Sequence, residues 1–217
     1  MNIINEITVN IVKKTKDGQS IRGLAHKIGF AYSAVYRWVL ELEGYGVISL
    51  IRKGNKSVIK INKNLIYKKF RELDKAVSVI EKDKIFWDLM KDSKLKARFV
   101  RGTASAIWTQ GGFITGDFYD KIYFLEVDIK YISNLKRTLT KYEIPYTKDK
   151  MINKRPLVYI IPKKKLKIDR KNGLPVMPLS EFIQWCEDLQ LDNILEQLKL
   201  LYGLRLKTKY AEVFTNA

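Results

Sequence analysis

Apolar positions in residues 20–44 predict two short helices joined by a tight turn. The first helix is preceded by Ser20, a good N-cap residue, and ends at Gly29, which tolerates the positive φ of a helix end. Its apolar face consists of Ile21, Leu24, Ala25 and Ile28. The second helix stops at Gly44, and its apolar face consists of Val35, Val39 and Leu42. The pattern therefore gives a helix, a turn and a helix in immediate succession.

A β-hairpin is predicted directly after these helices. Residues 47–52 and 57–62 read as strands around the tip 53–56, whose glycine suits a tight turn. Before them, apolar residues at helical spacing predict a further helix that ends near residues 17–18: Ile3, Ile4, Ile7, Ile11 and Val12. We expect residues 1–64 to form one domain.

The segment 29–48, GFAYSAVYRWVLELEGYGVI, resembles the recognition helix and the turn into the wing of winged helix-turn-helix transcription regulators. The resemblance implies that residues 1–64 bind double-stranded DNA, with the second helix in the major groove. One departure is Ala31, where these helices commonly carry a capping Ser or Thr.

Seven residues are the candidate DNA contacts. If the apolar face of the second helix is buried, its outward face carries Tyr32, Ser33, Tyr36 and Arg37. Arg37 suits a guanine or a phosphate, whereas the hydroxyl-bearing residues suit phosphates or thymine methyl groups. On the wing, Arg52, Lys53 and Lys56 would lie along a flanking backbone or minor groove. The competing interpretation is a winged helix that binds protein instead of DNA.

The net charge supports a polyanionic partner. The 217 residues include 41 Lys and Arg against 23 Asp and Glu, a formal charge of +18. Residues 1–64 hold 11 basic and 4 acidic side chains, so positive charge extends over both parts of the chain. A composition rich in Lys and Ile also occurs in heat-adapted cytosolic proteins, which is the alternative explanation. The lysine run 163–165 is either part of a nucleic-acid footprint or a solvated face.

Composition also excludes several kinds of chemistry. Cys186 is the only cysteine and His26 the only histidine, so a disulfide, a Cys-based metal site and a His-dependent triad are not expected. No apolar stretch approaches membrane-spanning length, and the first ten residues lack the features of a signal peptide. We expect a cytoplasmic protein with no cofactor and no membrane partner.

The remaining residues predict a linker helix and a second domain, so the fold class is α+β. The linker helix, 65–80, either lies on its own domain or supports a homodimer. In the second domain, 81–217, strands are interspersed with helices. We expect a helix from residue 85 to 92, further helices capped by Ser133, Ser180 and Asp192, and a turn at Asn172-Gly173.

Residues 99–124, FVRGTASAIWTQGGFITGDFYDKIYF, resemble the opening of the nucleotidyltransferase fold. In that fold, two carboxylates separated by one residue on a strand hold Mg²⁺. Here Asp120 matches the first carboxylate, but Ile122 stands at the position of the second. A rival alignment takes Glu126 and Asp128 as the pair, with Asp169 as a third acid. The simpler interpretation is a solvated strand end, so we assign no catalytic residue and no metal ligand.

Residues 167–189, KIDRKNGLPVMPLSEFIQWCEDL, resemble AbiEi-type antitoxins of abortive-infection systems when taken with the N-terminal winged helix. The resemblance implies a repressor of its own operon and a toxin protein as partner. The predicted function is a DNA-binding transcription regulator. The alternatives are a Mg²⁺-dependent nucleotidyltransferase that holds nucleic acid with its winged helix, and a structural nucleic-acid-binding protein without sequence preference.

Overall fold

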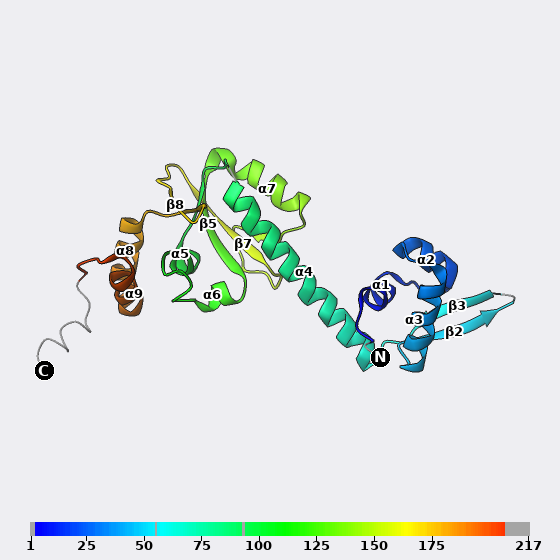
Figure 1. Cartoon of the computed structure of the whole chain (residues 1–217). Coiled ribbons are helices and arrows are strands. Elements are labelled where there is room, and N and C mark those ends of the chain that lie inside the picture. The colour runs from blue at the N-terminus through cyan, green and yellow to red at the C-terminus, as the bar shows by residue number, and fades with distance from the viewer. Residues whose placement is uncertain (1–2, 55, 93, 207–217) are drawn as a thin grey trace, which may run out of the picture. The chain divides into compact units, whose positions relative to one another are not determined.

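The computed structural model describes residues 3–54, 56–92 and 94–206 and has an α+β fold with two sheets (Figure 1). The chain divides into two compact units, Met1–Ser78 and Val79–Ala217, and each unit has its own sheet and its own core. The α+β class predicted from the sequence is confirmed.

The first unit packs three helices against a three-stranded antiparallel sheet with the strand order β1-β3-β2. The Ser20 hydroxyl accepts a hydrogen bond from the backbone N–H of Gly23, and Gly29 has a φ of 79°, so both predicted ends of the first of the two paired helices are confirmed. The elements are α1 (Glu6–Lys14), β1 (Gln19–Ser20), α2 (Ile21–Ile28), α3 (Tyr32–Gly44), β2 (Ile48–Lys53) and β3 (Lys56–Ile61).

Two details of this unit differ from the prediction. Helix α1 ends at Lys14 instead of near residues 17–18, because the chain turns there to form the short strand β1, which pairs with β3. The strands of the hairpin extend to Lys53 and Lys56, so the tip is shorter than expected. Gly54 has a φ of 58°, and Asn55 lies outside the described residues.

The linker helix and the helix expected after it form one continuous helix, α4 (Leu65–Asp92). The predicted break near residue 81 is therefore wrong, and the reason is that no Gly or Pro interrupts these 28 residues. The Asn64 side chain accepts a hydrogen bond from the backbone N–H of Tyr67 at 2.9 Å. Phe70 belongs to the core of the first unit, whereas Phe86 and Met90 belong to the core of the second.

The second unit is built on a six-stranded mixed sheet with the order β6-β7-β5-β4-β9-β8. Strands β5 and β7 run parallel, and β4 is antiparallel to β5. Residues 174–176 form β9 between β4 and β8, and the turn predicted at Asn172 and Gly173 is confirmed, because both residues have positive φ between the two strands. The strands are β4 (Ala97–Phe99), β5 (Ile122–Asp128), β6 (Tyr146–Thr147), β7 (Leu157–Lys163), β8 (Asp169–Lys171) and β9 (Leu174–Val176).

Helices α7 and α8 begin earlier than their predicted caps, Ser133 and Ser180, whereas α9 begins at its predicted cap residue, Asp192. The N-cap positions of α7, α8 and α9 are Tyr131, Pro178 and Leu191, and none of them uses a side-chain cap. Before α7, the Asp128 carboxylate accepts a hydrogen bond from the backbone N–H of Lys130, so Ser133 is not needed as a cap. These elements are α5 (Arg101–Trp108), α6 (Gly116–Tyr119), the 3₁₀ helix η1 (Ile129–Tyr131), α7 (Ile132–Lys141), α8 (Leu179–Asp188) and α9 (Asp192–Tyr202).

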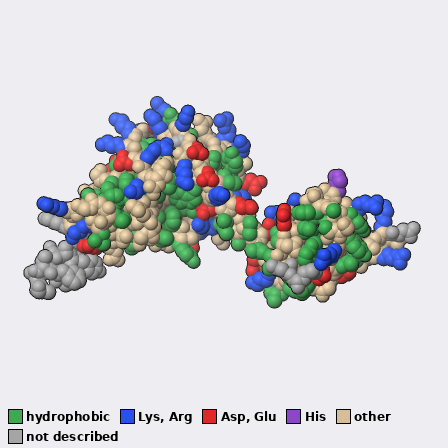
Figure 2. Space-filling model, in the orientation of Figure 1, with side chains coloured by type: hydrophobic (Ala, Val, Ile, Leu, Met, Phe, Trp, Pro, Cys, Tyr) green, Lys and Arg blue, Asp and Glu red, His purple; other side chains and the backbone are tan. Residues whose placement is uncertain are grey.

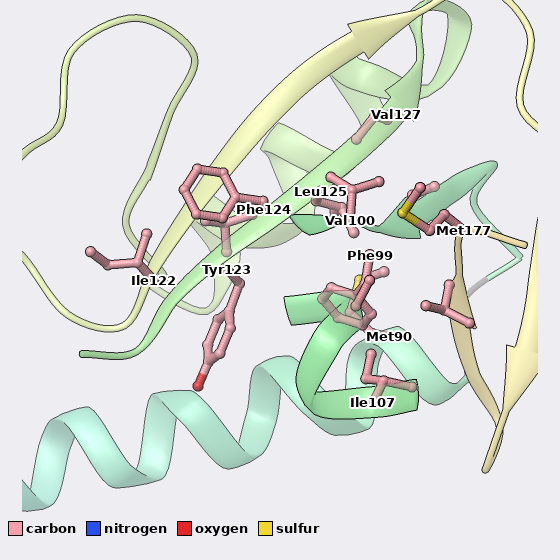
Figure 3. Packing of buried hydrophobic residues seen from close by; sticks show 14 of the residues in the cluster. Met90, Phe99, Val100, Ile107, Ile122, Tyr123, Phe124, Leu125, Val127 and Met177 are labelled. Carbon is pink, nitrogen blue, oxygen red and sulfur yellow. The ribbon is translucent and has the colours of Figure 1, made fainter. Parts of the chain in front are cut away.

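Alternate side chains of β5 point to opposite faces of the sheet (Figure 3). Tyr123 points toward α4, where its ring stacks on Phe86 with a centroid distance of 5.2 Å, and Phe124 points the other way. The Tyr123 hydroxyl donates a hydrogen bond to Asp83, a carboxylate that also pairs with Lys121 at 2.8 Å. Burial, reinforced by Asp83, raises the pKa of Tyr123 above its ordinary value, so this phenol is a neutral structural group at physiological pH.

Candidate nucleic-acid interface

The outward face of α3 carries the four helix residues predicted as DNA contacts. Val35, Val39 and Leu42 are completely buried, and this fixes the orientation of the helix. The opposite face therefore exposes side chains near the N-terminal end of the helix: Tyr32, Ser33, Tyr36 and Arg37. The Tyr32 and Tyr36 rings stack with a centroid distance of 5.8 Å and remain 48% and 41% exposed. Ala31 supplies no side-chain cap, as its sequence position indicated.

The hairpin presents the three cations predicted for the wing. Arg52, Lys53 and Lys56 are all exposed, and Figure 2 shows Lys and Arg side chains at the hairpin end of this unit. Arg52 is directly opposite Ser57, and Lys53 is directly opposite Lys56. Because neighbours in a ladder share a face and successive residues alternate, Arg52 and Ser57 lie on the face that carries the buried Ile59, whereas Lys53 and Lys56 lie on the other.

A groove of about 630 Å³ joins the helical part of this interface to the hairpin. Its lining brings Tyr32, Tyr36 and Lys56 together with four residues that sequence reasoning did not assign to the site: Ser20, Ile21, Arg22 and Ser57. The other four predicted contacts, Ser33, Arg37, Arg52 and Lys53, lie outside the lining of this groove, on the exposed surface of α3 and the hairpin.

Strand β1 explains how the start of α2 reaches the groove. Ser20 is paired with Val58 of β3, which places the first turn of α2 beside the hairpin. The exposed Arg22 follows, and its guanidinium carbon lies 6.0 Å from the centroid of the Tyr32 ring. A two-residue strand has no recognisable sequence pattern, so only the cap role of Ser20 was visible in advance.

The groove has the chemistry of an anion-binding surface. Arg22 and Lys56 supply positive charge, and the hydroxyl groups of Ser57, Tyr32 and Tyr36 supply hydrogen-bond donors. The lining residues include no carboxylate. Phosphate oxygens accept hydrogen bonds from this combination of side chains, so the arrangement suits a sugar–phosphate backbone.

The carboxylates considered for Mg²⁺ in the second unit have other roles. The Glu126 carboxylate accepts hydrogen bonds from Arg98 at 2.8 Å and from Lys163 at 3.2 Å. The Asp128 carboxylate accepts a bond from the backbone N–H of Lys130 at 3.0 Å. Both acids are therefore already used within the fold. The Glu126 side chain is only 13% exposed, so this strand end is part of an ion-pair network and not the solvated end that the sequence predicted.

The third acid of that alignment, Asp169, lies on the opposite face of the sheet. The strand register places Asp169 on the same face of the sheet as Leu125. Glu126 is the next residue after Leu125, so it points to the opposite face. Asp169 also lies in β8, three strands from β5 in the sheet order. Across residues 3–54, 56–92 and 94–206, no group of three or more His, Cys, Asp and Glu side chains is arranged to hold a metal ion.

The alignment that uses Asp120 fails for a different reason. Asp120 is exposed and follows α6 as its C-cap, whereas Ile122, which stands at the second carboxylate position, is buried in the core. The described residues at this position therefore offer a single carboxylate where the nucleotidyltransferase chemistry needs two.

Comparisons of the chain with protein families, curated proteins and solved structures give no match. Within the described part of the chain, no helix combines the length and apolar character needed to cross a membrane.

Proposed function

We propose that the first unit is a winged helix-turn-helix that binds duplex DNA and that the protein acts as a transcriptional repressor. The observation that carries this proposal is the groove at the junction of α2, α3 and β3. Its arginine, lysine and hydroxyl groups suit phosphates, and the exposed face of α3 continues directly from it.

In the proposed complex α3 enters the major groove, which has room for one helix. Tyr32 and Tyr36 extend from α3 toward the major groove of the DNA, where their side chains can contact phosphates and thymine methyl groups. Arg37 lies one position further around the helix, with its guanidinium carbon 5.9 Å from the centroid of the Trp38 ring. Arginine at such a position can bind guanine through two hydrogen bonds. Repression then follows from occupancy of a promoter.

The antitoxin role and the nucleotidyltransferase-like fold of the second unit stay predictions from the two resemblances. The order of elements in residues 169–188, a strand, a glycine turn, a strand and a helix, supports the first of them only in outline. A toxin partner and a homodimer are therefore outside the proposal made for the first unit.

In vitro selection tests this function directly. The full chain is incubated with a pool of random-sequence duplexes, and bound DNA is recovered and amplified over several rounds. We expect enrichment of one short sequence, because α3 presents base-reading side chains in addition to phosphate contacts. A pool that stays random while DNA is still retained would replace the proposed repressor with a binder that has no sequence preference.

The wing should contribute mainly electrostatic contacts. Changing Arg52, Lys53 and Lys56 to Gln removes three exposed cations from the hairpin. The slope of log K against log salt for the selected duplex is negative, and it should become less steep by about 0.9 for each phosphate that the wing no longer neutralises, or by up to about 2.7 in total. Fluorescence anisotropy titrations of the full chain at several salt concentrations give this slope.

A matched control changes Lys63, Lys68 and Lys75, three exposed lysines of the same unit that do not line the groove, to Gln. The control should leave the slope nearly unchanged, although it removes the same charge. If both triple variants reduce the slope equally, the effect is one of net charge, and the hairpin has no special contact with DNA.

A further inference from the structure

Six exposed lysines lie at one edge of the sheet of the second unit, where the ends of three neighbouring strands come together. Asp128 donates its backbone N–H to the carbonyl of Lys96 at 2.9 Å, and it is directly opposite Lys163 in the parallel ladder. The start of β4 and the ends of β5 and β7 therefore lie together. We call this group the lysine end: Lys96, Lys130, Lys163, Lys164, Lys165 and Lys167.

Figure 2 shows Lys and Arg side chains crowded over this part of the second unit, where the connection from β5 to α7 and the loop from β7 to β8 lie in Figure 1. Four carboxylates belong to the ends of these strands, to the start of β8 or to the ion pairs of Arg98: Glu126, Asp128, Asp169 and Glu181. With Arg98 counted among the cations, seven positive groups stand against four negative ones. Among the described residues, the six lysines form a single salt bridge, between Lys163 and Glu126.

A buried arginine ties the lysine-bearing loop to the sheet. The Arg98 side chain is 4% exposed, and its guanidinium pairs with Glu126 at 2.7 Å and with Glu181 of α8 at 2.7 Å. The same guanidinium donates a hydrogen bond to the backbone carbonyl of Lys167 at 2.8 Å. The backbone of the loop between β7 and β8 is thus anchored to the sheet at Lys167, next to Lys163, Lys164 and Lys165.

The chemistry of the lysine end favours phosphates over bases. Ammonium groups bind phosphate as point charges, and reading bases in single strands usually requires aromatic platforms. Among the described residues of the second unit, Tyr119 is the exposed aromatic side chain, and it precedes β5 at the other end of that strand. The surface is therefore suited to contacts that do not depend on sequence.

We propose that the lysine end is a second binding surface, which contacts the sugar–phosphate backbone of the duplex that the first unit recognises. The choice of ligand rests on the function proposed for the first unit, whereas the site itself rests on the geometry of the second. Linking such a surface to a sequence-reading unit raises the affinity for every duplex by the same factor and leaves the preference among sequences unchanged.

The test uses the full chain with Lys164, Lys165 and Lys167 changed to Gln. Binding to the selected duplex and to a scrambled duplex of the same length is measured by anisotropy between about 50 and 200 mM salt. We expect the affinity for both duplexes to fall by the same factor. The negative slope of log K against log salt should become less steep by up to about 2.7. The matched control changes Lys148, Lys150 and Lys154, exposed lysines that precede β7 at its other end, and should have little effect.

Each result decides the proposal. An unchanged salt slope in the loop variant, with an unchanged thermal unfolding curve, would overturn it. Poly-glutamate serves as a competing acidic polypeptide, and a variant that loses poly-glutamate binding but keeps its DNA affinity would assign the surface to an acidic protein. Failure of the function proposed for the first unit is distinguishable, because the selection would then enrich no duplex, whereas the effect of the loop variant on the affinity for a random duplex and on its salt dependence stays measurable.

Discussion

Changing Arg98 to alanine should destabilise the second unit more than any exposed substitution in it. The change leaves Glu126 and Glu181 without their shared partner and the Lys167 carbonyl without its donor. Breaking a fully buried pair costs about 3–5 kcal/mol. Here we expect a decrease of about 2–4 kcal/mol in the free energy of unfolding, because Lys163 still neutralises Glu126 and Glu181 reaches water.

Urea unfolding of the full chain, followed by tryptophan fluorescence, measures this change. Three of the four tryptophans, Trp87, Trp108 and Trp185, lie in the second unit, so the signal mainly reports its unfolding. The control is Lys82→Ala, which breaks a surface pair with Glu143 and should cost less than about 1 kcal/mol. An Arg98→Ala loss no larger than that of the control would show that the buried network does not hold the loop.

Changing Arg37 to alanine should weaken binding to the selected duplex by about 1–3 kcal/mol, or about 5- to 150-fold, if its guanidinium binds a base. The loss on a scrambled duplex should be smaller, because a base contact is absent there. Equilibrium titrations of the full chain with both duplexes, at one fixed salt concentration, give the two values.

Arg137→Ala is the matched control for that measurement. Arg137 is an exposed arginine on α7 of the second unit, so its loss removes the same side chain and the same charge away from α3. Equal losses on both duplexes for Arg37→Ala would make Arg37 a phosphate contact. Affinity as high as that of the control would contradict the proposed orientation of α3 on DNA.

Local signals explain which parts of the fold could be predicted from the sequence. Ser20 and Gly29 have strong conformational preferences of their own, and the apolar spacing of α3 is regular, so these features were visible without tertiary information. The orientation of Tyr32 and Tyr36 follows from the same spacing. Strands β5 and β7 were also predictable, because they are long and mostly apolar.

The missed features depend on contacts between residues far apart in the chain. Strand β9 is three residues long and is fixed by pairing with β4 and β8, so its own sequence did not predict a strand. The groove of the first unit likewise forms only because β1 pairs with β3. The buried position of Arg98 ran against the usual exposure of arginine, and its partner Glu181 is 83 residues away.

The central claim is that the first unit supplies sequence preference and the second does not. The most direct test is the ratio of affinities for the selected and the scrambled duplex, measured in the full chain and in two variants at one salt concentration. One variant combines Tyr36→Ala with Arg37→Ala on α3, and the other carries the three Gln substitutions at the lysine end. Point variants suit this test better than truncation, because a cut near residue 80 would fall inside the continuous helix α4.

We expect the α3 variant to bring the ratio close to one, whereas the lysine-end variant should lower both affinities and keep the ratio. The reason is that base contacts discriminate among sequences and phosphate contacts strengthen all of them alike. A ratio that survives in the α3 variant but disappears in the lysine-end variant would contradict the central claim, because the second unit would then read the DNA sequence.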